Sequence, residues 1–195
     1  GQKLNLRVGV SSEVQRYSLN FTEPFFLDRR VSAGFSLFNT ENDYDNEANL
    51  ETRSTGVGGR VAFPLSEDGR LSIFLNLSED ELDNTSSSSL VNPSYKDFKQ
   101  EIGYYYSIDK RDDAIDPTAG WNFGVGQDLA GPAGDITYLR TTTVANYYYE
   151  IAEGWVFHGR GTAGLIYDYD GGVINYSDRF FKGGASFRGF DRSGI

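Results

Sequence analysis

Apolar and polar residues alternate with a period of two over long stretches of the sequence, and this alternation constrains the fold more than any other feature. In the clearest example, Leu4, Leu6, Val8 and Val10 are separated by polar or small residues. Successive side chains of a β-strand point to opposite faces, so such a segment has one apolar and one polar face. The alternation predicts an all-β fold.

The same pattern recurs along the whole chain and predicts about nine strands. Clear alternation runs through residues 17–21, 31–37, 71–77 and 155–165, and weaker versions start near positions 55, 102, 121 and 139. Most of these segments can extend to the 9–11 residues or so of a tilted membrane-spanning strand, whereas strands of soluble domains average about 5 to 6. Strand length therefore favours an antiparallel transmembrane β-barrel over a β-sandwich.

Composition excludes some classes of protein and leaves others open. No stretch approaches the roughly 18 apolar residues of a transmembrane helix. The mean hydropathy of −0.46 suits a soluble domain or a membrane barrel equally, because barrel strands alternate lipid-facing and lumen-facing residues. The net charge of −10 argues against nucleic acid as a partner, and the absence of cysteine excludes disulfides and thiolate metal sites.

Short and long links alternate between the predicted strands, as in outer-membrane barrels, whose periplasmic turns are short. Residues 28–30, 66–69 and 150–154 form short links, while 40–52, 79–97 and the segment from 168 onwards are long and polar. Two links fit less well, since 131–134 is short where a long link is due and 112–120 is long where a turn is due. We expect 40–52 and 79–97 to be reachable from outside the cell, and 66–69 to be periplasmic.

Two runs of three tyrosines, at 104–106 and 147–149, are candidates for the aromatic girdles of a membrane barrel. The alternative is that tyrosine is simply a good strand former.

A search for catalytic or metal-binding residues finds no recognisable site. His158 is the only histidine, and a polar, lumen-facing position beside Arg160 is favoured over a catalytic base, which would need a serine and a carboxylate nearby. Zinc spacings, a P-loop and a nucleophile elbow are absent. One stretch is acidic and contains Glu41, Asp43, Asp45, Glu47 and Glu51. Its spacing does not match that of a calcium-binding loop, and neither does that of the pair Asp168 and Asp170. No metal, cofactor or enzymatic activity is predicted.

Three short motifs remain. The segment FFKGGASFRGF at 180–190 combines glycines, which permit tight folding of a long loop, with an arginine whose planar fork suits carboxylates; its key residues are Gly183, Gly184, Phe187, Arg188, Gly189 and Phe190. The segment FTEPFF at 21–26 contains Phe21, Glu23, Pro24 and Phe26, and the segment DDAIDPTAG at 112–120 contains Asp113, Pro117, Thr118 and Gly120.

In the same order, these motifs resemble signature segments of the BamA family of outer-membrane insertases, in which the glycine-rich motif lies in the long sixth extracellular loop. Phe187 departs from the Val or Ile that commonly precedes the arginine. The resemblance covers the whole chain and implies about the third through eleventh of sixteen strands. Residues 1–195 would then be a partial barrel domain that ends inside loop six (170–195), an internal excerpt without the POTRA domains and terminal strands.

The resemblance also implies a function. The protein would fold and insert client β-barrel proteins into the outer membrane of a Gram-negative bacterium, without a cofactor. Its partners would be outer-membrane lipid and lipopolysaccharide, client barrels, and accessory lipoproteins bound through the absent periplasmic domains. Loop six would tuck into the lumen, where acidic residues beyond Ile195 hold Arg188. The alternatives are a TamA-like or two-partner secretion translocation barrel and a passive porin.

Overall fold

The structure is a computed structural model that describes residues 1–11, 14–43, 50–84, 94–131, 133–172, 174–175 and 178–180. Its strands form one antiparallel sheet in which each strand pairs with the next along the chain. The nine strands are β1 (Lys3–Val10), β2 (Val14–Glu23), β3 (Ser32–Asp43), β4 (Leu50–Pro64), β5 (Gly69–Asn84), β6 (Tyr95–Asp109), β7 (Gly120–Ala130), β8 (Tyr138–Ala152) and β9 (Trp155–Tyr167). The predicted all-β fold of about nine strands is confirmed.

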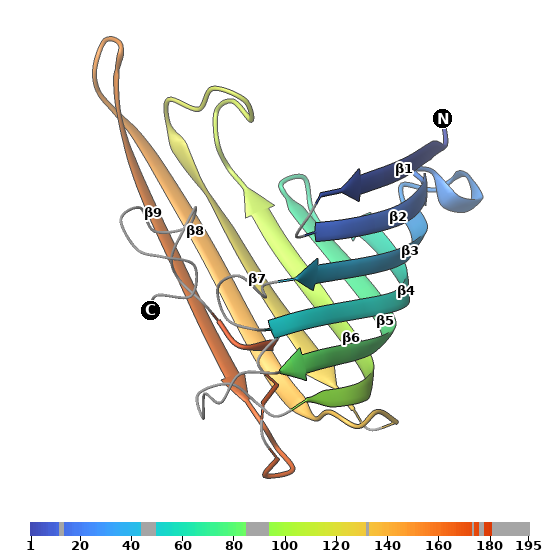
Figure 1. The fold of residues 1–195 in the computed structure, drawn as a ribbon. Coiled ribbons are helices and arrows are strands. Elements are labelled where there is room, and N and C mark those ends of the chain that lie inside the picture. Colours follow the sequence, from blue (N-terminus) through green and yellow to red (C-terminus); the bar gives the residue numbers. More distant parts are fainter. Residues whose placement is uncertain are drawn as a thin grey trace.

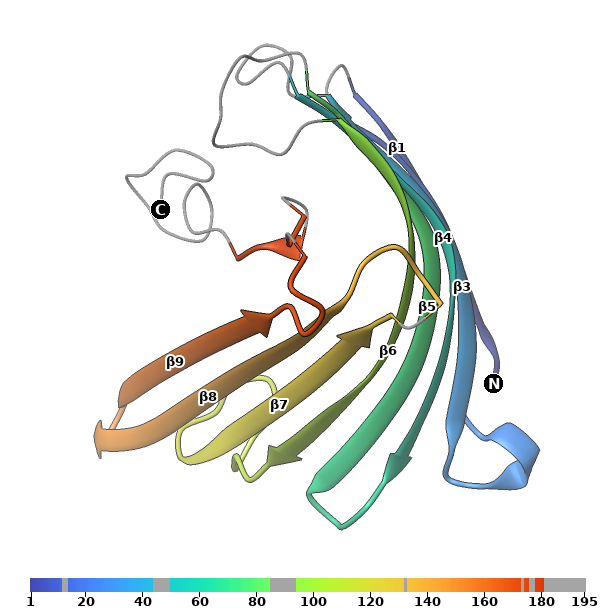
Figure 2. The same ribbon diagram turned by 90° about the horizontal axis from the view of Figure 1, so that it is seen from below.

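The sheet curves strongly, so that it has a concave and a convex face (Figures 1 and 2). The convex face carries the apolar members of the alternation: Leu6 pairs with Leu19 and Leu19 with Leu37, and Leu6 is 71% exposed. Exposed apolar side chains continue across every strand, and so large a patch is typical of a surface that meets lipid or a partner. The concave face carries the polar members and corresponds to a barrel lumen.

Two strand pairs run further than the sequence predicted. Residues 40–52 and 79–97 were expected to be loops, but β3 continues to Asp43, β4 begins at Leu50 and β5 reaches Asn84. Charged pairs hold these extensions on the outward face: Arg53 lies 3.2 Å from Glu41, 3.4 Å from Glu51 and 3.7 Å from Glu81. Paired strands do not need apolar alternation where both faces meet water, which is why the pattern did not reveal them.

Links of different length lie at the two ends of the sheet. At one end they cover residues 24–31, 65–68, 110–119 and 153–154, and at the other 11–13, 44–49, 85–94 and 131–137. The longer link predicted at 112–120 is confirmed, whereas 131–134 is only the first part of a seven-residue link, because β8 begins at Tyr138. In the described part of the chain no helix is long and apolar enough to cross a membrane.

Each tyrosine run is divided between the two faces. Tyr104 and Tyr106 pair with Ile73 and Leu71 on the convex face, so Tyr105 between them faces the lumen side. Tyr148 likewise faces inward and stacks on His158 at 4.4 Å. Whether the outward tyrosines form a membrane girdle stays a prediction.

Candidate functional site: a charged network on the concave face

A half-buried lysine joins the wall of the sheet to the segment that follows β9. The Lys99 ammonium on β6 lies 2.7 Å from Asp80 on β5 and 2.9 Å from Asp178, and these two carboxylates are 7% and 3% exposed. The Ser54 hydroxyl on β4 donates a further hydrogen bond of 2.6 Å to Asp80. One cation therefore pairs with two buried acids, one from the wall and one from the segment that follows β9.

A second group of side chains lies beside the lysine. The Tyr138 hydroxyl on β8 lies 2.6 Å from Glu101 and 3.2 Å from Asp178, and the tyrosine is fully buried. Arg140 binds Glu101 at 3.2 Å and Asp128 on β7 at 2.9 Å. Ion pairs and hydrogen bonds thus connect acids, cations and hydroxyls that come from five strands, β4 to β8, as buried charges require.

Further contacts fix the segment after β9 against the concave face, where Figure 2 shows it lying inside the curve of the sheet. The Asn175 amide donates to Asp97 at 2.8 Å, and the Tyr169 hydroxyl donates to the Ala130 carbonyl oxygen at 2.6 Å. The Phe180 ring occupies the space that a side chain at Gly164 would need. An apolar cluster of Ala130, Ile136, Tyr138 and Ile166 lies beneath the network. We call this polar network the lumenal anchor. Its members are Ser54, Asp80, Asp97, Lys99, Glu101, Asp128, Tyr138, Arg140, Asn175 and Asp178.

The lumenal anchor holds a chain segment against the wall of the sheet. Its acids are paired with cations or accept hydrogen bonds, and within the described residues no group of histidine and acidic side chains could hold a metal ion. One acceptor, Oδ2 of Asp178, is buried without a hydrogen-bond partner among the described residues. The contacts of the other oxygen, with the Lys99 ammonium and the Tyr138 hydroxyl, therefore have to offset the burial of this carboxylate.

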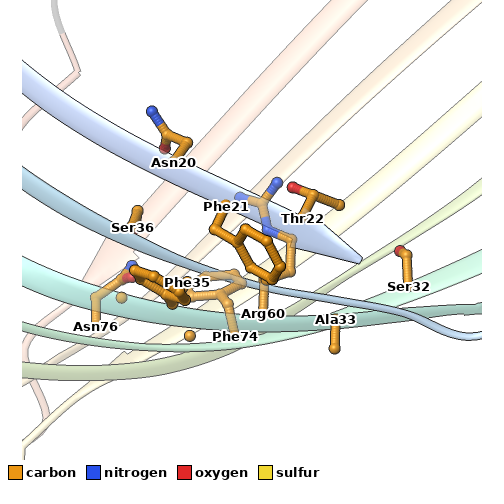
Figure 3. A pocket seen from close by; sticks show the side chains of 13 residues that line it. Asn20, Phe21, Thr22, Ser32, Ala33, Phe35, Ser36, Arg60, Phe74 and Asn76 are labelled. Atoms are coloured by element: carbon orange, nitrogen blue, oxygen red, sulfur yellow. The ribbon is translucent and has the colours of Figure 1, made fainter. Parts of the chain in front are cut away.

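A small gap in the wall lies away from this network. It measures about 150 Å³ and lies where Gly34, Gly58 and Gly59 leave the sheet without side chains. Figure 3 shows the surrounding residues, among them Phe21, Phe35, Arg60 and Asn76. Small-molecule sites usually measure roughly 300–1,000 Å³. We therefore interpret this gap as a part of the sheet that lacks side chains rather than as a binding site.

The first signature segment forms the end of β2 and the turn after it. Phe21 lies on the convex face and stacks on Phe35 with ring centroids 5.5 Å apart. The Glu23 carboxylate accepts a hydrogen bond of 3.2 Å from the backbone N–H of Phe25. Pro24 follows in the turn, and Phe26 begins the short 3-10 turn η1 (Phe26–Asp28).

The second signature segment forms the β6–β7 link. The Asp113 carboxylate accepts hydrogen bonds from the backbone N–H groups of Ile115 and Asp116, at 2.6 and 2.9 Å. Pro117 and Thr118 are half-buried, and Gly120 has a φ of 96°. A side chain at Gly120 would also collide with the Lys110 carbonyl oxygen. Glycine is therefore required here both for the positive φ and for the space. The two signature segments lie at the same end of the sheet, four strands apart, and no contact joins them in the described part of the chain.

The Asp112 carboxylate organises the second segment and makes the stability of this link depend on pH. Its carboxylate accepts hydrogen bonds from the Thr118 hydroxyl and the backbone N–H groups of Ala119, Thr118 and Asp113, and these lower its pKa to about 2. A lowered pKa stabilises the folded link above the unfolded value of about 3.9, and this contribution is lost as the pH falls towards 2. Proteolysis at 110–119 should therefore increase between about pH 4 and pH 2, and Asp112→Ala should show the increase already at neutral pH. An unchanged cleavage rate in Asp112→Ala at neutral pH would refute the role of this carboxylate.

The glycine-rich motif, Gly183 to Phe190, lies outside the described residues, so its predicted contacts stay predictions. Asp178 precedes it by five positions in the sequence. His158 lies on the concave face as expected, with Nε2 3.2 Å from the Asn146 side-chain oxygen. In the acidic stretch Glu41 and Glu51 lie in strands and pair with Arg53, while Asp45 and Glu47 lie outside the described residues.

Comparison with known proteins identifies the family. The profile of the Omp85 superfamily domain matches residues 1–195. The chain belongs to the Omp85 superfamily. Within it, the chain is 26% identical over 197 residues to the outer membrane protein assembly factor BamA of Neorickettsia risticii, and 24% identical over 214 residues to that of Neisseria meningitidis. These alignments cover 99% and 98% of the chain, and the chain spans 26% of the length of each relative.

A solved Omp85 structure has the same fold. The crystal structure of BamA from Haemophilus ducreyi lacking POTRA domains 1-3 superimposes with a TM-score of 0.88 at 21% identity, covering all of this chain and 41% of that one. The resemblance to the BamA family predicted from three motifs is thereby confirmed, and the nine-stranded sheet is part of such a barrel.

Sequence reasoning missed the lumenal anchor, although one signal for it is present. Lys99 and Glu101 are two residues apart on β6, as are Tyr138 and Arg140 on β8, so each pair lies on one face. The lumenal anchor could have been indicated by this pattern: oppositely charged or hydrogen-bonding residues two positions apart, on the polar face of strands whose apolar alternation is weak.

Proposed function

We propose that this chain is part of an assembly factor that folds and inserts client β-barrel proteins into the outer membrane of a Gram-negative bacterium. The observation that carries the proposal is the match of the entire chain to proteins named as outer membrane protein assembly factor BamA. The convex apolar face agrees with a place in a membrane, because its exposed side chains would otherwise face water.

The lumenal anchor supports this function structurally. In the proposal it holds the start of the sixth extracellular loop inside the barrel through Asn175 and Asp178, and the motif that contains Arg188 follows directly in the sequence. The protein performs no chemistry on its clients. Client barrels, outer-membrane lipid with lipopolysaccharide, and accessory lipoproteins bound through periplasmic domains are its proposed partners. A TamA-like or two-partner secretion barrel and a porin are less well supported, since the two relatives and the solved structure reported above are all BamA proteins.

The end of the sheet with the links 24–31 and 65–68 is proposed to face the periplasm, because the chain leaves β9 at the opposite end and continues there into the segment that resembles the family's sixth extracellular loop. The ends of β3 and β5 would then project outside the cell.

The test is complementation of a depleted chromosomal copy by the full-length gene. Wild type should restore growth and the level of assembled client barrels, whereas Arg188→Ala should not, because removing one partner of a buried ion pair costs on the order of 3–5 kcal/mol. Arg188→Lys keeps the charge but loses the planar fork, so it should restore only part of the level. Arg192→Ala, nearby in the sequence, is the control.

Two results would contradict the proposal. Normal client levels during depletion would show that the protein is not the assembly factor. Equal, wild-type behaviour of the Arg188 and Arg192 variants would show that the glycine-rich motif is not its functional element.

A further inference from the structure

The β2–β3 turn exposes three consecutive apolar side chains. Phe25, Phe26 and Leu27 are 60%, 45% and 74% exposed. The turn is nevertheless ordered by hydrogen bonds, from the Phe26 N–H to the Val31 carbonyl oxygen at 2.7 Å and from the Asp28 N–H to the Phe25 carbonyl oxygen at 3.1 Å. These apolar side chains are therefore held in place outside the sheet.

The backbone of this turn is also strained. Leu27 and Asp28 have φ values of 55° and 58°, in the left-handed region that residues other than glycine rarely adopt. The structure holds Leu27 in this conformation although its side chain gains almost no burial from it. Strained backbone of this kind concentrates at binding sites, where the surroundings impose the conformation.

The turn encloses a hollow against the outer wall of the barrel. The hollow measures about 560 Å³ and lies between the side chains of the turn and those of the convex face, where its lining includes Phe21, Ala33 and Phe35. Figure 2 shows the turn curling away from the concave side of the sheet. The volume is in the range of small-molecule sites, roughly 300–1,000 Å³, and the lining is mainly apolar. The hollow is continuous with the face that we propose meets lipid.

Two cations lie directly beside the apolar residues. Arg29 and Arg30 follow η1 and are exposed, and neither forms an ion pair within the described residues. Apolar side chains next to arginines are the composition of segments that lie in a membrane interface, where the rings enter the acyl region and guanidinium groups bind phosphate.

We propose that the β2–β3 turn binds a phospholipid of the periplasmic leaflet, with an acyl chain in the hollow and the headgroup phosphate at Arg29 and Arg30. The inference rests on the proposed outer-membrane location and orientation. Lipid is favoured over a protein partner because the hollow opens on the same face as the exposed apolar wall, and because Arg29 and Arg30 directly follow Asp28, the last residue of the turn that lines it. The bound lipid would fix the level at which this part of the barrel lies in the membrane.

The position of the turn can be tested with nitroxide labels on engineered cysteines in the full-length protein, after replacement of any cysteine outside these 195 residues. The protein is reconstituted in vesicles of phosphatidylethanolamine and phosphatidylglycerol. A label at Leu27 should collide more with oxygen, which concentrates in lipid, than with a water-soluble nickel chelate. Leu75, outward on β5, is the lipid control, and Glu67, in the β4–β5 link at the same end, is the water control.

The possible outcomes separate this inference from the proposed function. If the label at Leu75 is in lipid and that at Leu27 is in water, the lipid site is overturned and the membrane barrel is supported. A label at Leu27 shielded from both reagents would indicate that protein covers the turn, which also overturns the lipid site. Labels in water at both positions would overturn the proposed membrane barrel together with the inference.

The headgroup contact needs a second measurement. Retention of fluorescent phosphatidylglycerol by the detergent-solubilised protein should fall about fivefold for Arg29→Gln and again for Arg30→Gln, since a basic residue at an anionic membrane surface contributes ~1 kcal/mol. Lys110→Gln, a cation at the same end of the sheet, should leave retention unchanged. Equal retention by the wild type and the double arginine variant would overturn the phosphate contact.

Discussion

Replacing Lys99 with methionine should release the segment after β9 from the concave face. The substitution keeps the length of the side chain but removes the cation that lies between Asp80 and Asp178. Two carboxylates would then be buried without their shared partner, and breaking a buried ion pair in this way costs on the order of 3–5 kcal/mol. In the folded full-length protein, limited proteolysis should cut the chain near residues 174–180 at least tenfold faster than in wild type.

Lys96 is the matched control, because it lies on the same strand and pairs with Glu79 at 2.9 Å, with both side chains 56% exposed. An exposed pair contributes at most about 1 kcal/mol, so Lys96→Met should be cut at nearly the wild-type rate. A double-mutant cycle adds a second criterion. Asp178→Asn removes one of the orphaned charges, so its effect in combination with Lys99→Met should be smaller than the sum of the two single effects. Strict additivity would mean that Lys99 and Asp178 do not act as a pair.

The strands could be predicted from the sequence because one face of the sheet has to be apolar. Every second residue of β1 is apolar for this reason, and Leu4, Leu6, Val8 and Val10 all lie on the convex face. The apolar alternation disappears where the strands extend beyond the apolar band. Glu41 and Arg53 face each other across β3 and β4 there, and their pairing depends on register rather than on hydrophobicity, so the ends of the strands could not be located.

The lumenal anchor could not be predicted for a different reason. Lys99 and Asp178 are 79 residues apart in the sequence, and their contact depends on how the chain turns back into the concave face after β9. Period-two alternation assigns a face to each residue of a strand but says nothing about what lies against that face. The signature turn at 112–120 was more accessible to sequence reasoning, since its Asp, Pro and Gly residues act within a few positions of one another.

Replacing Gly103 with valine should prevent much of the protein from reaching its folded state. Gly103 is buried on the concave side of β6, and a Cβ atom there would lie 2.5 Å from the Phe74 ring, 2.6 Å from the Gln127 carbonyl oxygen and 2.8 Å from the Asp128 carboxylate. The ring can move, but the carbonyl oxygen belongs to the neighbouring strand, whose spacing is fixed at roughly 4.7–4.9 Å by the backbone hydrogen bonds. Overpacking of this kind costs about 1–3 kcal/mol or more, and it would also displace the acid that binds Arg140. The fraction of the full-length protein that migrates as a folded barrel on unheated gels should fall severalfold.

The control for this experiment is Gly59→Val on β4. Gly59 lies on the convex face, paired with Phe35 and Leu75, and a Cβ atom there would meet no atom within 4 Å. Valine favours strands and adds apolar surface on the side that we propose meets lipid, so this variant should fold at least as well as wild type. The two glycines therefore separate steric exclusion on the lumen side from a general loss of glycine. If both variants fold equally well, the close approach of β7 to Gly103 does not limit the packing of the wall. If only Gly103→Val fails, the fold requires a residue without a side chain where the Gln127 carbonyl oxygen and the Phe74 ring approach β6.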